Sequence, residues 1–314
     1  MRTAVIGIGY LGRFHAQKYA ALPNSNLVGV ADPSGAARSK ASAEFNVAAY
    51  ADYRELLGKV DAVSIVTPTP SHFEVAQAFL DAGAHVLVEK PMTASIAEGE
   101  QLIALAAKAG RVLQVGHLER FNAAVKAVQP SLSVPRFLES ARLAPFKQRG
   151  TDVNVVLDLM IHDIDLILSI VRSPVVSVDA IGSSIFSQEI DIANARLRFA
   201  NGCVANATAS RVSLKTERKL RLFQDDAYVS MDLQQKILTI IRKGNGVGAD
   251  GMPQVAIDET TYEQGDALND EIKAFLESAA SGGAAAVSGE DGLLALRTAL
   301  TITEQVQRSA AKFS

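Results

Sequence analysis

Residues 3–12 of the chain read TAVIGIGYLG. A short apolar run, typical of a buried strand, leads into three glycines with the spacing GxGxxG, and a helical pattern follows to about residue 21. Glycines at a strand-to-helix turn let the chain bend tightly and bring backbone N–H groups close to a pyrophosphate, where the helix dipole favours negative charge. We therefore expect this turn to bind a dinucleotide through Gly7, Gly9, Tyr10, Leu11 and Gly12.

An acidic residue follows the last of these glycines at a distance of about 20 residues. This residue, Asp32, ends a second predicted strand, Leu27–Ala31, where a carboxylate commonly binds the adenosine ribose hydroxyls of NAD. The same carboxylate would repel the 2′-phosphate of NADP. The sequence therefore predicts NAD as the cofactor, and NADP is the less favoured alternative that the nearby Arg38 keeps open.

Six short apolar strands alternate with helical stretches in the first part of the chain. They occupy residues 3–6, 27–31, 48–50, 61–66, 84–88 and 111–115. Regular alternation predicts an α/β fold in which a doubly wound parallel sheet has right-handed connections, that is, a Rossmann domain. We place this NAD-binding domain at residues 1–118.

Polar residues come directly after two of these strands. Ligands of an open parallel sheet bind at the carboxyl ends of its strands. We therefore expect further cofactor contacts from Thr67, Thr69, His72, Glu89 and Lys90. For His72 the alternative is a place at a helix N-terminus without any ligand contact.

Lys90 stands immediately before Pro91, and a proline restricts the residue that precedes it to extended backbone. Such a position fixes the direction of the side chain. A lysine directed toward the nicotinamide could stabilise negative charge that develops on a substrate oxygen. The alternative is an ordinary surface lysine in a loop.

Residues 153–171 read VNVVLDLMIHDIDLILSIV. Apolar residues recur on every side at helical spacing, which predicts a buried helix. Asp158, His162 and Asp165 are spaced so that they share one face of it. Two interpretations stand side by side: a core histidine held between two carboxylates, or a general base whose tautomer and basicity a carboxylate sets.

The overall composition excludes several classes of protein. The chain has 314 residues, 48% of them hydrophobic and 21% charged, which suits two soluble domains. A formal charge of −3 disfavours a nucleic-acid partner. We expect no signal peptide, no membrane span and no metal site. The single cysteine, Cys203, is consistent with a cytoplasmic protein.

From Arg136 onward, strand patterns follow one another without intervening helices. They occupy residues 136–143, 175–182, 192–199, 203–211, 219–223, 228–232 and 237–242, with a glycine-rich turn expected at 244–250. Asn201-Gly202 is a strong hairpin signal. This pattern predicts an α+β domain with an open, mainly antiparallel sheet. Because small and apolar residues alternate along the strands, we expect the uncovered sheet face to form a homodimer or homotetramer.

Three features together resemble the glucose-fructose oxidoreductase and inositol dehydrogenase family, Gfo/Idh/MocA: the glycine turn, the triplet Glu89-Lys90-Pro91 and the pair Asp158-x-x-x-His162. The resemblance covers nearly the whole chain. It implies that a nicotinamide cofactor oxidises a sugar or polyol alcohol, with catalytic roles for Lys90, Asp158 and His162. It also implies a substrate-binding and oligomerisation domain at 119–285 and a C-terminal helix, 286–314, that packs back on the Rossmann domain. One departure is that Asn154-Val-Val-Leu157 stands where many members have glycines.

Three further segments resemble the branch of that family that contains UDP-N-acetylglucosamine 3-dehydrogenases. They are residues 116–122, 142–146 and 149–152. This resemblance implies a 3-keto nucleotide sugar as product, which is aminated for a diamino-sugar form of lipid A. A pyrophosphate in the substrate would need fixed cations. The candidate substrate contacts are Lys90, His117, Arg142, Lys147, Arg149, Asp158, His162 and Arg211.

The sequence thus predicts an NAD-dependent dehydrogenase that oxidises a sugar secondary alcohol, with a nucleotide sugar as the favoured substrate. An inositol, another polyol or a monosaccharide is the alternative within the enzyme class, and Arg142, Lys147 and Arg149 would then be solvated basic residues. A non-catalytic NAD-binding sensor is the alternative outside it.

Overall fold

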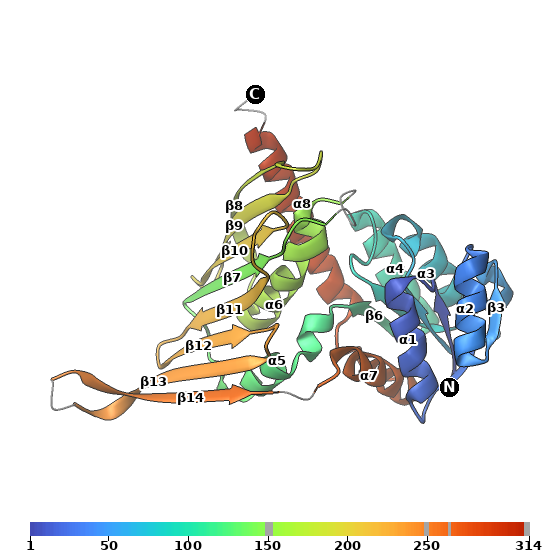
Figure 1. Ribbon diagram of the computed structural model, residues 1–314, viewed down its shortest axis with the longest axis horizontal. Helices are drawn as coiled ribbons and strands as arrows, with labels where there is room; N and C mark the ends of the chain where they lie inside the picture. Colours follow the sequence, from blue (N-terminus) through green and yellow to red (C-terminus); the bar gives the residue numbers. More distant parts are fainter. Residues whose placement is uncertain (148–152, 248–250, 263–264, 311–314) are drawn as a thin grey trace. The chain divides into compact units, whose positions relative to one another are not determined.

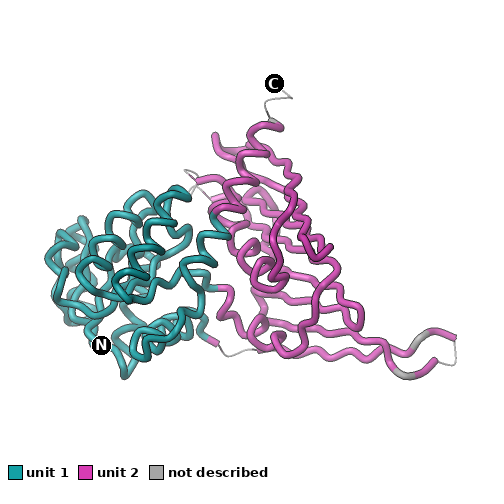
Figure 2. The backbone as a smooth tube through the Cα atoms, turned by 180° about the vertical axis from the view of Figure 1, so that it is seen from behind, with its two compact units in different colours: residues 1–118, 266–296 teal, residues 119–265, 297–314 magenta. Residues whose placement is uncertain are grey.

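The computed structural model describes residues 1–147, 153–247, 251–262 and 265–310. The chain divides into two compact units, each made of two segments (Figure 2): Met1–Leu118 with Asp266–Leu296, and Glu119–Gly265 with Arg297–Ser314. One division between the units falls at residue 118. Helix α7 (Ala267–Ser281) belongs to the first unit, and α8 (Gly289–Ala310) contributes to both.

The first unit contains a six-stranded parallel sheet in the order β3-β2-β1-β4-β5-β6 (Figure 1). The strands are β1 (Arg2–Ile6), β2 (Asn26–Ala31), β3 (Ala48–Tyr50), β4 (Ala62–Ile65), β5 (His85–Glu89) and β6 (Leu113–Gly116). The strand order reverses at β1, where β2 lies on one side and β4 on the other. This is the doubly wound arrangement that the alternation predicted, and it puts a ligand crevice at the carboxyl ends of β1 and β4.

Among the described residues, five helices cover this sheet: α1 (Tyr10–Ala21), α2 (Gly35–Phe45), α3 (His72–Asp81), α4 (Ile96–Ala109) and α7 (Ala267–Ser281). Right-handed crossovers on either side of the reversal put α1 and α2 on one face and α3 and α4 on the other. Helix α7 joins the α1 face, because Ile272, Phe275 and Leu276 pack into the same core cluster as Tyr19 and Val5. Sequence periodicity could not show which sheet this amphipathic helix would cover.

The second unit contains an eight-stranded sheet in the order β14-β13-β12-β11-β7-β10-β9-β8. The strands are β7 (Phe137–Leu143), β8 (Val175–Ser183), β9 (Ile192–Phe199), β10 (Val204–Ser210), β11 (Glu217–Phe223), β12 (Ala227–Asp232), β13 (Ile237–Val247) and β14 (Pro253–Thr261). Only the β7–β10 pairing is parallel among them. The predicted antiparallel sheet is therefore confirmed, as is the β9–β10 hairpin at Asn201-Gly202, where Gly202 has a φ of 88°.

In the part of the chain that the structure describes, three helices accompany this second sheet: α5 (Ala123–Val128), α6 (Ile161–Val171) and α8 (Gly289–Ala310). Helix α6 is the buried helix of the sequence pattern, and Ile161, Ile164 and Leu166 are fully enclosed. It is preceded by one turn of π-helix, Val156–Met160, which the periodicity did not predict. Turns of this kind often mark functional sites.

The two faces of the second sheet differ in polarity. The small and apolar residues of β9 and β10, such as Ala193, Ala195 and Ala207, are buried. The alternate positions carry polar side chains, and Asn194 donates a hydrogen bond across the strands to Thr208 at 2.8 Å. The small residues that suggested a subunit contact are thus in the core, because a period of two does not tell which face is buried.

None of the helices in the described part of the chain is long and apolar enough to cross a bilayer. The same residues contain no cluster of three or more His, Cys, Asp or Glu side chains that could hold a metal ion. Cys203 is buried, and burial raises the pKa of its thiol to about 11.

Candidate functional site

At two positions of the glycine turn, Gly7 and Gly12, the structure allows only glycine. Gly7 has a φ of 85°, and a Cβ atom there would lie 2.6 Å from the Val66 carbonyl oxygen. A Cβ on Gly12 would lie 1.9 Å from the Gly7 oxygen, so α1 approaches the turn as closely as a backbone can. A Cβ on Gly9 would meet no atom within 4 Å. The turn therefore has open space at Gly9, next to the N-terminus of α1, and this fits a pyrophosphate.

Asp32 connects the glycine turn to the start of α2. Its carboxylate accepts hydrogen bonds from the backbone N–H groups of Ile8 and Ser34, both at 2.8 Å. Arg38 donates to the backbone carbonyl oxygens of Asp32 and Pro33, at 2.7 and 2.9 Å. These contacts direct one terminal nitrogen of the guanidinium to the main chain, which favours NAD over NADP.

A cavity of about 220 Å³ lies beside this turn. Residues of the turn, α1 and α2 line it: Ile8, Gly9, Tyr10, Arg13, Phe14, Ala37, Lys40 and Ala41. Its position between the two helices at the carboxyl end of β1 agrees with the place of a dinucleotide in this type of sheet.

The loop after β4 contributes one unsatisfied polar group. Among the described residues, the buried Oγ1 atom of Thr67 has no hydrogen-bond partner. Buried hydroxyls are normally satisfied, so a bound cofactor is a suitable partner for it. Thr69 begins a short 3₁₀ turn, Thr69–Ser71, and is partly exposed.

His72 is buried and links this loop to the segment that follows Lys90. Its Nε2 lies 2.8 Å from the Thr67 carbonyl oxygen and its Nδ1 lies 2.9 Å from that of Pro91. A neutral imidazole can donate to only one of these carbonyls. Burial lowers the pKa of His72, although both carbonyls and Glu89 favour the charged form. Both ring nitrogens thus face carbonyl oxygens of the protein backbone, which fits the alternative interpretation of His72 as a residue without a ligand contact.

Glu89 also faces the protein. One carboxylate oxygen lies 3.2 Å from Nε2 of the buried His15, and the other accepts from the backbone N–H of Lys90 at 3.3 Å. A Cβ on Gly116 would lie 2.8 Å from this carboxylate, so that glycine leaves the space it needs. Burial by itself would raise the pKa of Glu89, but His15, Lys90 and His72 outweigh it and lower the pKa. An ionised Glu89 therefore holds the backbone of Lys90, whose side chain is half-buried at the carboxyl end of β5.

In the second unit, Asp158 lies in the π-turn and His162 is the second residue of α6. Both side chains are half-buried. Asn154 caps the turn, because its Oδ1 accepts from the backbone N–H groups of Val156 and Leu157 at 3.1 and 3.0 Å. The residue that departs from the family's glycine pattern thus has a defined role in starting the helix.

Two arginines hold α6 through aspartates that follow His162 in the chain. Arg142 from β7 makes a two-point contact with Asp163, at 3.0 and 2.9 Å, and also donates to Glu119 at 2.9 Å. Burial opposes the charge on Arg142, but both carboxylates outweigh it and raise its pKa. Arg120 makes a second two-point contact with Asp165, at 2.8 and 2.7 Å.

Three residues that the sequence predicted as substrate contacts are buried in the protein. Arg142 is 4% exposed, and its charge is paired inside the protein. Arg211 is equally buried and donates to the carbonyl oxygens of Val153 and Ile190, next to Asp191. The ring of His117 is buried. These buried positions favour structural roles. The sequence did not show this, because a spacing pattern cannot reveal partners that lie far away in the chain.

Lys147 is exposed, as a phosphate contact requires. Arg149 lies outside the described residues.

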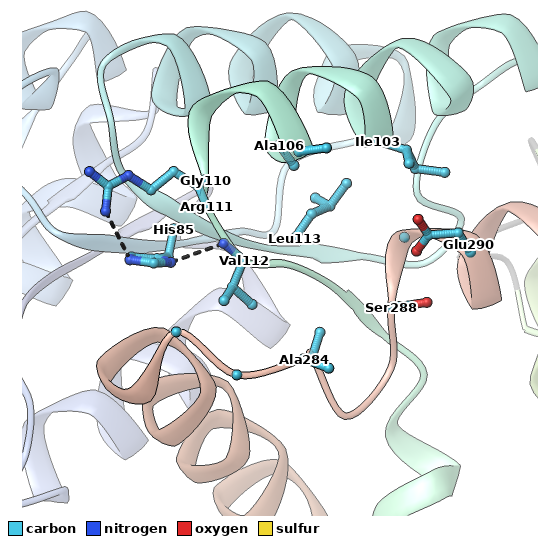
Figure 3. Close-up of a pocket in the computed structure, with 15 residues that line it drawn as sticks. His85, Ile103, Ala106, Gly110, Arg111, Val112, Leu113, Ala284, Ser288 and Glu290 are labelled. Carbon is cyan, nitrogen blue, oxygen red and sulfur yellow. Dashed lines mark hydrogen bonds between the residues drawn. The ribbon is translucent and has the colours of Figure 1, made fainter.

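A second cavity in the first unit, of about 370 Å³, is lined by residues of α4, β5 and β6 and by the segment that joins α7 to α8 (Figure 3). It is found at the amino ends of β5 and β6, where His85 accepts a hydrogen bond from the backbone of Val112 at 3.0 Å. Arg111 and Glu290 are exposed at its edge. Ligands of parallel sheets bind at the opposite, carboxyl ends of the strands, so this cavity is separate from the cofactor site.

Comparison with known proteins agrees with this geometry. Residues 1–117 match the model of the "Oxidoreductase family, NAD-binding Rossmann fold", and residues 125–230 match the "GFO/IDH/MocA C-terminal domain". The chain belongs to the Gfo/Idh/MocA oxidoreductases. An NAD-binding domain and an oxidoreductase fold, both predicted from the sequence, are thereby confirmed.

Several relatives in the Gfo/Idh/MocA family match along nearly the whole chain. The UDP-N-acetylglucosamine 3-dehydrogenase of Acidithiobacillus ferrooxidans is 41% identical over 308 residues, which are 98% of this chain and 97% of that protein. Its solved structure superposes with a TM-score of 0.93 over 98% of each chain. The myo-inositol 2-dehydrogenase of Thermotoga maritima is 27% identical and covers 94% of this chain and 93% of its own length. A levoglucosan dehydrogenase solved with NADH and L-sorbose has a TM-score of 0.87 at 20% identity, covering 98% of this chain and 97% of its own, and so shares the fold.

Proposed function

We propose that this protein is an NAD-dependent dehydrogenase that oxidises the secondary alcohol at C3 of UDP-N-acetylglucosamine. The 41% identity to the A. ferrooxidans enzyme over 98% of the chain carries the proposal. The inositol dehydrogenases match the chain more weakly, at 27% identity and below. The 3-keto product would suit a subsequent amination, as in the making of a diamino sugar.

NAD, when bound at the glycine turn, supplies the acceptor for the hydride. The residues proposed to hold it are Gly7, Gly9, Gly12 and the Thr67 hydroxyl, and Asp32 is the proposed ribose contact. The open space at Gly9 and the unsatisfied Thr67 hydroxyl support this assignment.

We assign the proton transfer to His162. A histidine that accepts the hydroxyl proton works as a general base near neutral pH and contributes about 10²- to 10⁴-fold to the rate. Asp158, one helical turn earlier, is proposed to orient and charge the imidazole. Lys90 is proposed to polarise the oxygen that becomes a ketone, since its backbone is fixed by Glu89 and by the proline that follows. Lys147 and Arg149 are proposed contacts for the diphosphate.

The experiment that tests the proposal measures NADH formation with purified protein, NAD and separate substrates. We expect turnover with UDP-N-acetylglucosamine and little with free N-acetylglucosamine, UDP-glucose or myo-inositol. Efficient oxidation of myo-inositol without oxidation of the nucleotide sugar would replace this proposal by the polyol alternative. Cofactor binding without oxidation of any alcohol would favour the sensor alternative.

We also propose a homodimer or homotetramer in the cytoplasm. Three aromatic side chains on the open side of the second sheet, Phe137, Phe223 and Tyr228, support a subunit contact. The ring centroid of Phe223 lies 5.5 Å from that of Phe137 and 5.1 Å from that of Tyr228. Light scattering that returns the mass of one 33.3 kDa chain at working concentration would contradict it. The single, buried Cys203 supports the proposed compartment.

A further inference from the structure

Two exposed aromatic rings form a pair at one end of the second sheet. Phe146 follows β7, and Phe186 lies in the loop between β8 and β9. Their ring centroids are 5.3 Å apart in an edge-to-face arrangement, and the side chains are 38% and 65% exposed. Large apolar side chains that gather in contact on a surface commonly mark a binding site.

The loop that carries Phe186 is held in one conformation by a buried carboxylate. Asp191 accepts hydrogen bonds from the backbone N–H groups of Ile185, Phe186 and Ser187, at 2.8, 2.7 and 2.9 Å. Burial would raise the pKa of Asp191, but these bonds and that of the Ser187 hydroxyl lower it to about 2. The carboxylate is therefore charged at any ordinary pH, and the ring is presented by an ordered loop.

The same loop is bonded to the start of the helix that carries Asp158 and His162. The backbone N–H of Val155 donates to the Ile190 carbonyl at 2.9 Å. Arg211 donates to the carbonyl oxygens of both Val153 and Ile190. The Phe186 loop thus lies against the residues that lead into the π-turn of Asp158.

The residues before Phe146 are fixed in a similar way. The backbone N–H of Ala144 donates to Ser210 at 2.8 Å, and its carbonyl accepts from Ser213 at 3.1 Å. Phe146 is followed at once by the exposed Lys147. The aromatic pair therefore has a cation beside it, on the same unit as the proposed catalytic base.

We propose that Phe146 and Phe186 form the platform on which the pyrimidine base of the nucleotide-sugar substrate stacks, with Lys147 toward its diphosphate. This inference rests on the proposed function. A base has a flat apolar face that stacks on aromatic side chains, and the neighbouring charge suits a diphosphate. Two rings are too small a surface for a stable protein contact, which buries about 800 Å² on each partner. The pair is thus proposed to select for the nucleotide part of the substrate, while the sugar reacts elsewhere in the site.

The test compares Phe186→Ala and Phe146→Ala with Val176→Ala, an exposed apolar side chain on β8 that serves as the matched control. At saturating NAD we expect each phenylalanine variant to raise the KM for UDP-N-acetylglucosamine at least about fivefold, with kcat within about twofold. UDP affinity, measured by calorimetry, should fall by the same factor. The KM for NAD and all constants of the control should stay at wild-type values, and Phe186→Trp should restore UDP affinity.

Different outcomes separate this inference from the proposed function. If the wild type oxidises UDP-N-acetylglucosamine but both alanine variants keep its KM and UDP affinity, the platform is wrong and the function stands. If the alanine variants change the mass of the assembly in light scattering and leave UDP affinity intact, the rings are a subunit contact and the inference is overturned. If the wild type neither binds UDP nor oxidises the nucleotide sugar, the proposed function itself fails.

Discussion

The surroundings of Lys90 and of His162 are built from different chemistry. The backbone around Lys90 is held by two groups whose pKa values their surroundings shift, namely Glu89 and His72. The helix of His162 is held by two arginines whose charge is permanent at ordinary pH. A change in pH can therefore alter the contacts around Lys90 directly. The position of the His162 helix depends instead on whether both partners of each charge pair are present.

The largest expected effect tests the chemistry that the arginine-held helix presents. His162→Ala should lower kcat by about 10²- to 10⁴-fold, because the proton of the substrate hydroxyl then has no positioned acceptor. NAD affinity, followed by calorimetry, should be unchanged, since the glycine turn belongs to the other unit. Wild-type turnover in this variant would remove His162 from the mechanism.

The next effect concerns the charge pairs of that helix. Arg142→Met should destabilise the protein by about 3–5 kcal/mol, because Asp163 and Glu119 would remain buried with their main cation lost. Arg196→Met, on the exposed face of β9, is the matched control and should cost less than about 1 kcal/mol. Urea unfolding of both variants checks the prediction. Equal midpoints would show that the buried pair adds nothing to stability.

Two glycine substitutions separate the role of the glycine turn in NAD binding from its role in stability. Gly9→Ala should fold normally, because its Cβ meets no atom within 4 Å, yet it should weaken NAD binding by at least about tenfold if a pyrophosphate fills that space. Gly12→Ala should instead lower the melting temperature, since its Cβ would overlap the Gly7 carbonyl. Calorimetry with NAD and thermal unfolding separate the two effects. Undiminished NAD affinity in Gly9→Ala would place the pyrophosphate elsewhere.

A smaller effect should appear in the dependence of stability on pH. Burial lowers the pKa of His72, so the unfolded chain binds a proton below about pH 6.5 before the folded protein does. Stability from this group is therefore complete above that pH and is lost as the pH falls toward the lowered value. His72→Gln should flatten the fall in melting temperature between neutral and mildly acidic pH. An unchanged slope would mean that other groups, such as His85, cause it.

The smallest effect concerns the unsatisfied hydroxyl in the cofactor loop. Thr67→Val keeps the shape of the side chain, and we expect no loss of stability because the hydroxyl has no partner among the described residues. The KM for NAD should rise a few-fold if the cofactor is that partner. A lower melting temperature with an unchanged KM would show that the hydroxyl serves the fold instead.

Local sequence signals predicted the first unit well. The spacing from Gly7 to Gly12 and on to Asp32 encodes a turn, a helix start and a strand end, and each of these depends on residues close together in the chain. The place of Lys90 followed in the same way from a strand end before a proline. Such signals suffice where the geometry of a site is a property of one strand-turn-helix segment.

The sequence did not reveal features that depend on contacts between residues far apart in the chain. Helix α6 carries two aspartates, and only the folded chain shows that Arg142 contacts Asp163. The π-turn at Asp158 leaves no mark in the periodicity. Strand β14 was missed because Asp258 and Glu259 hide its pattern. The role of Phe186 depends on Asp191, whose backbone contacts follow from a loop shape that no motif encodes.

The buried thiol of Cys203 has a practical use. A thiol with so high a pKa is almost wholly protonated at neutral pH and out of reach of maleimide reagents. Cys203 should therefore stay unlabelled when a cysteine introduced elsewhere in the chain is labelled. A fluorophore attached to a cysteine introduced at Ser184, two residues before Phe186, would report the arrival of a nucleotide as a change in emission, with no native residue competing for the dye.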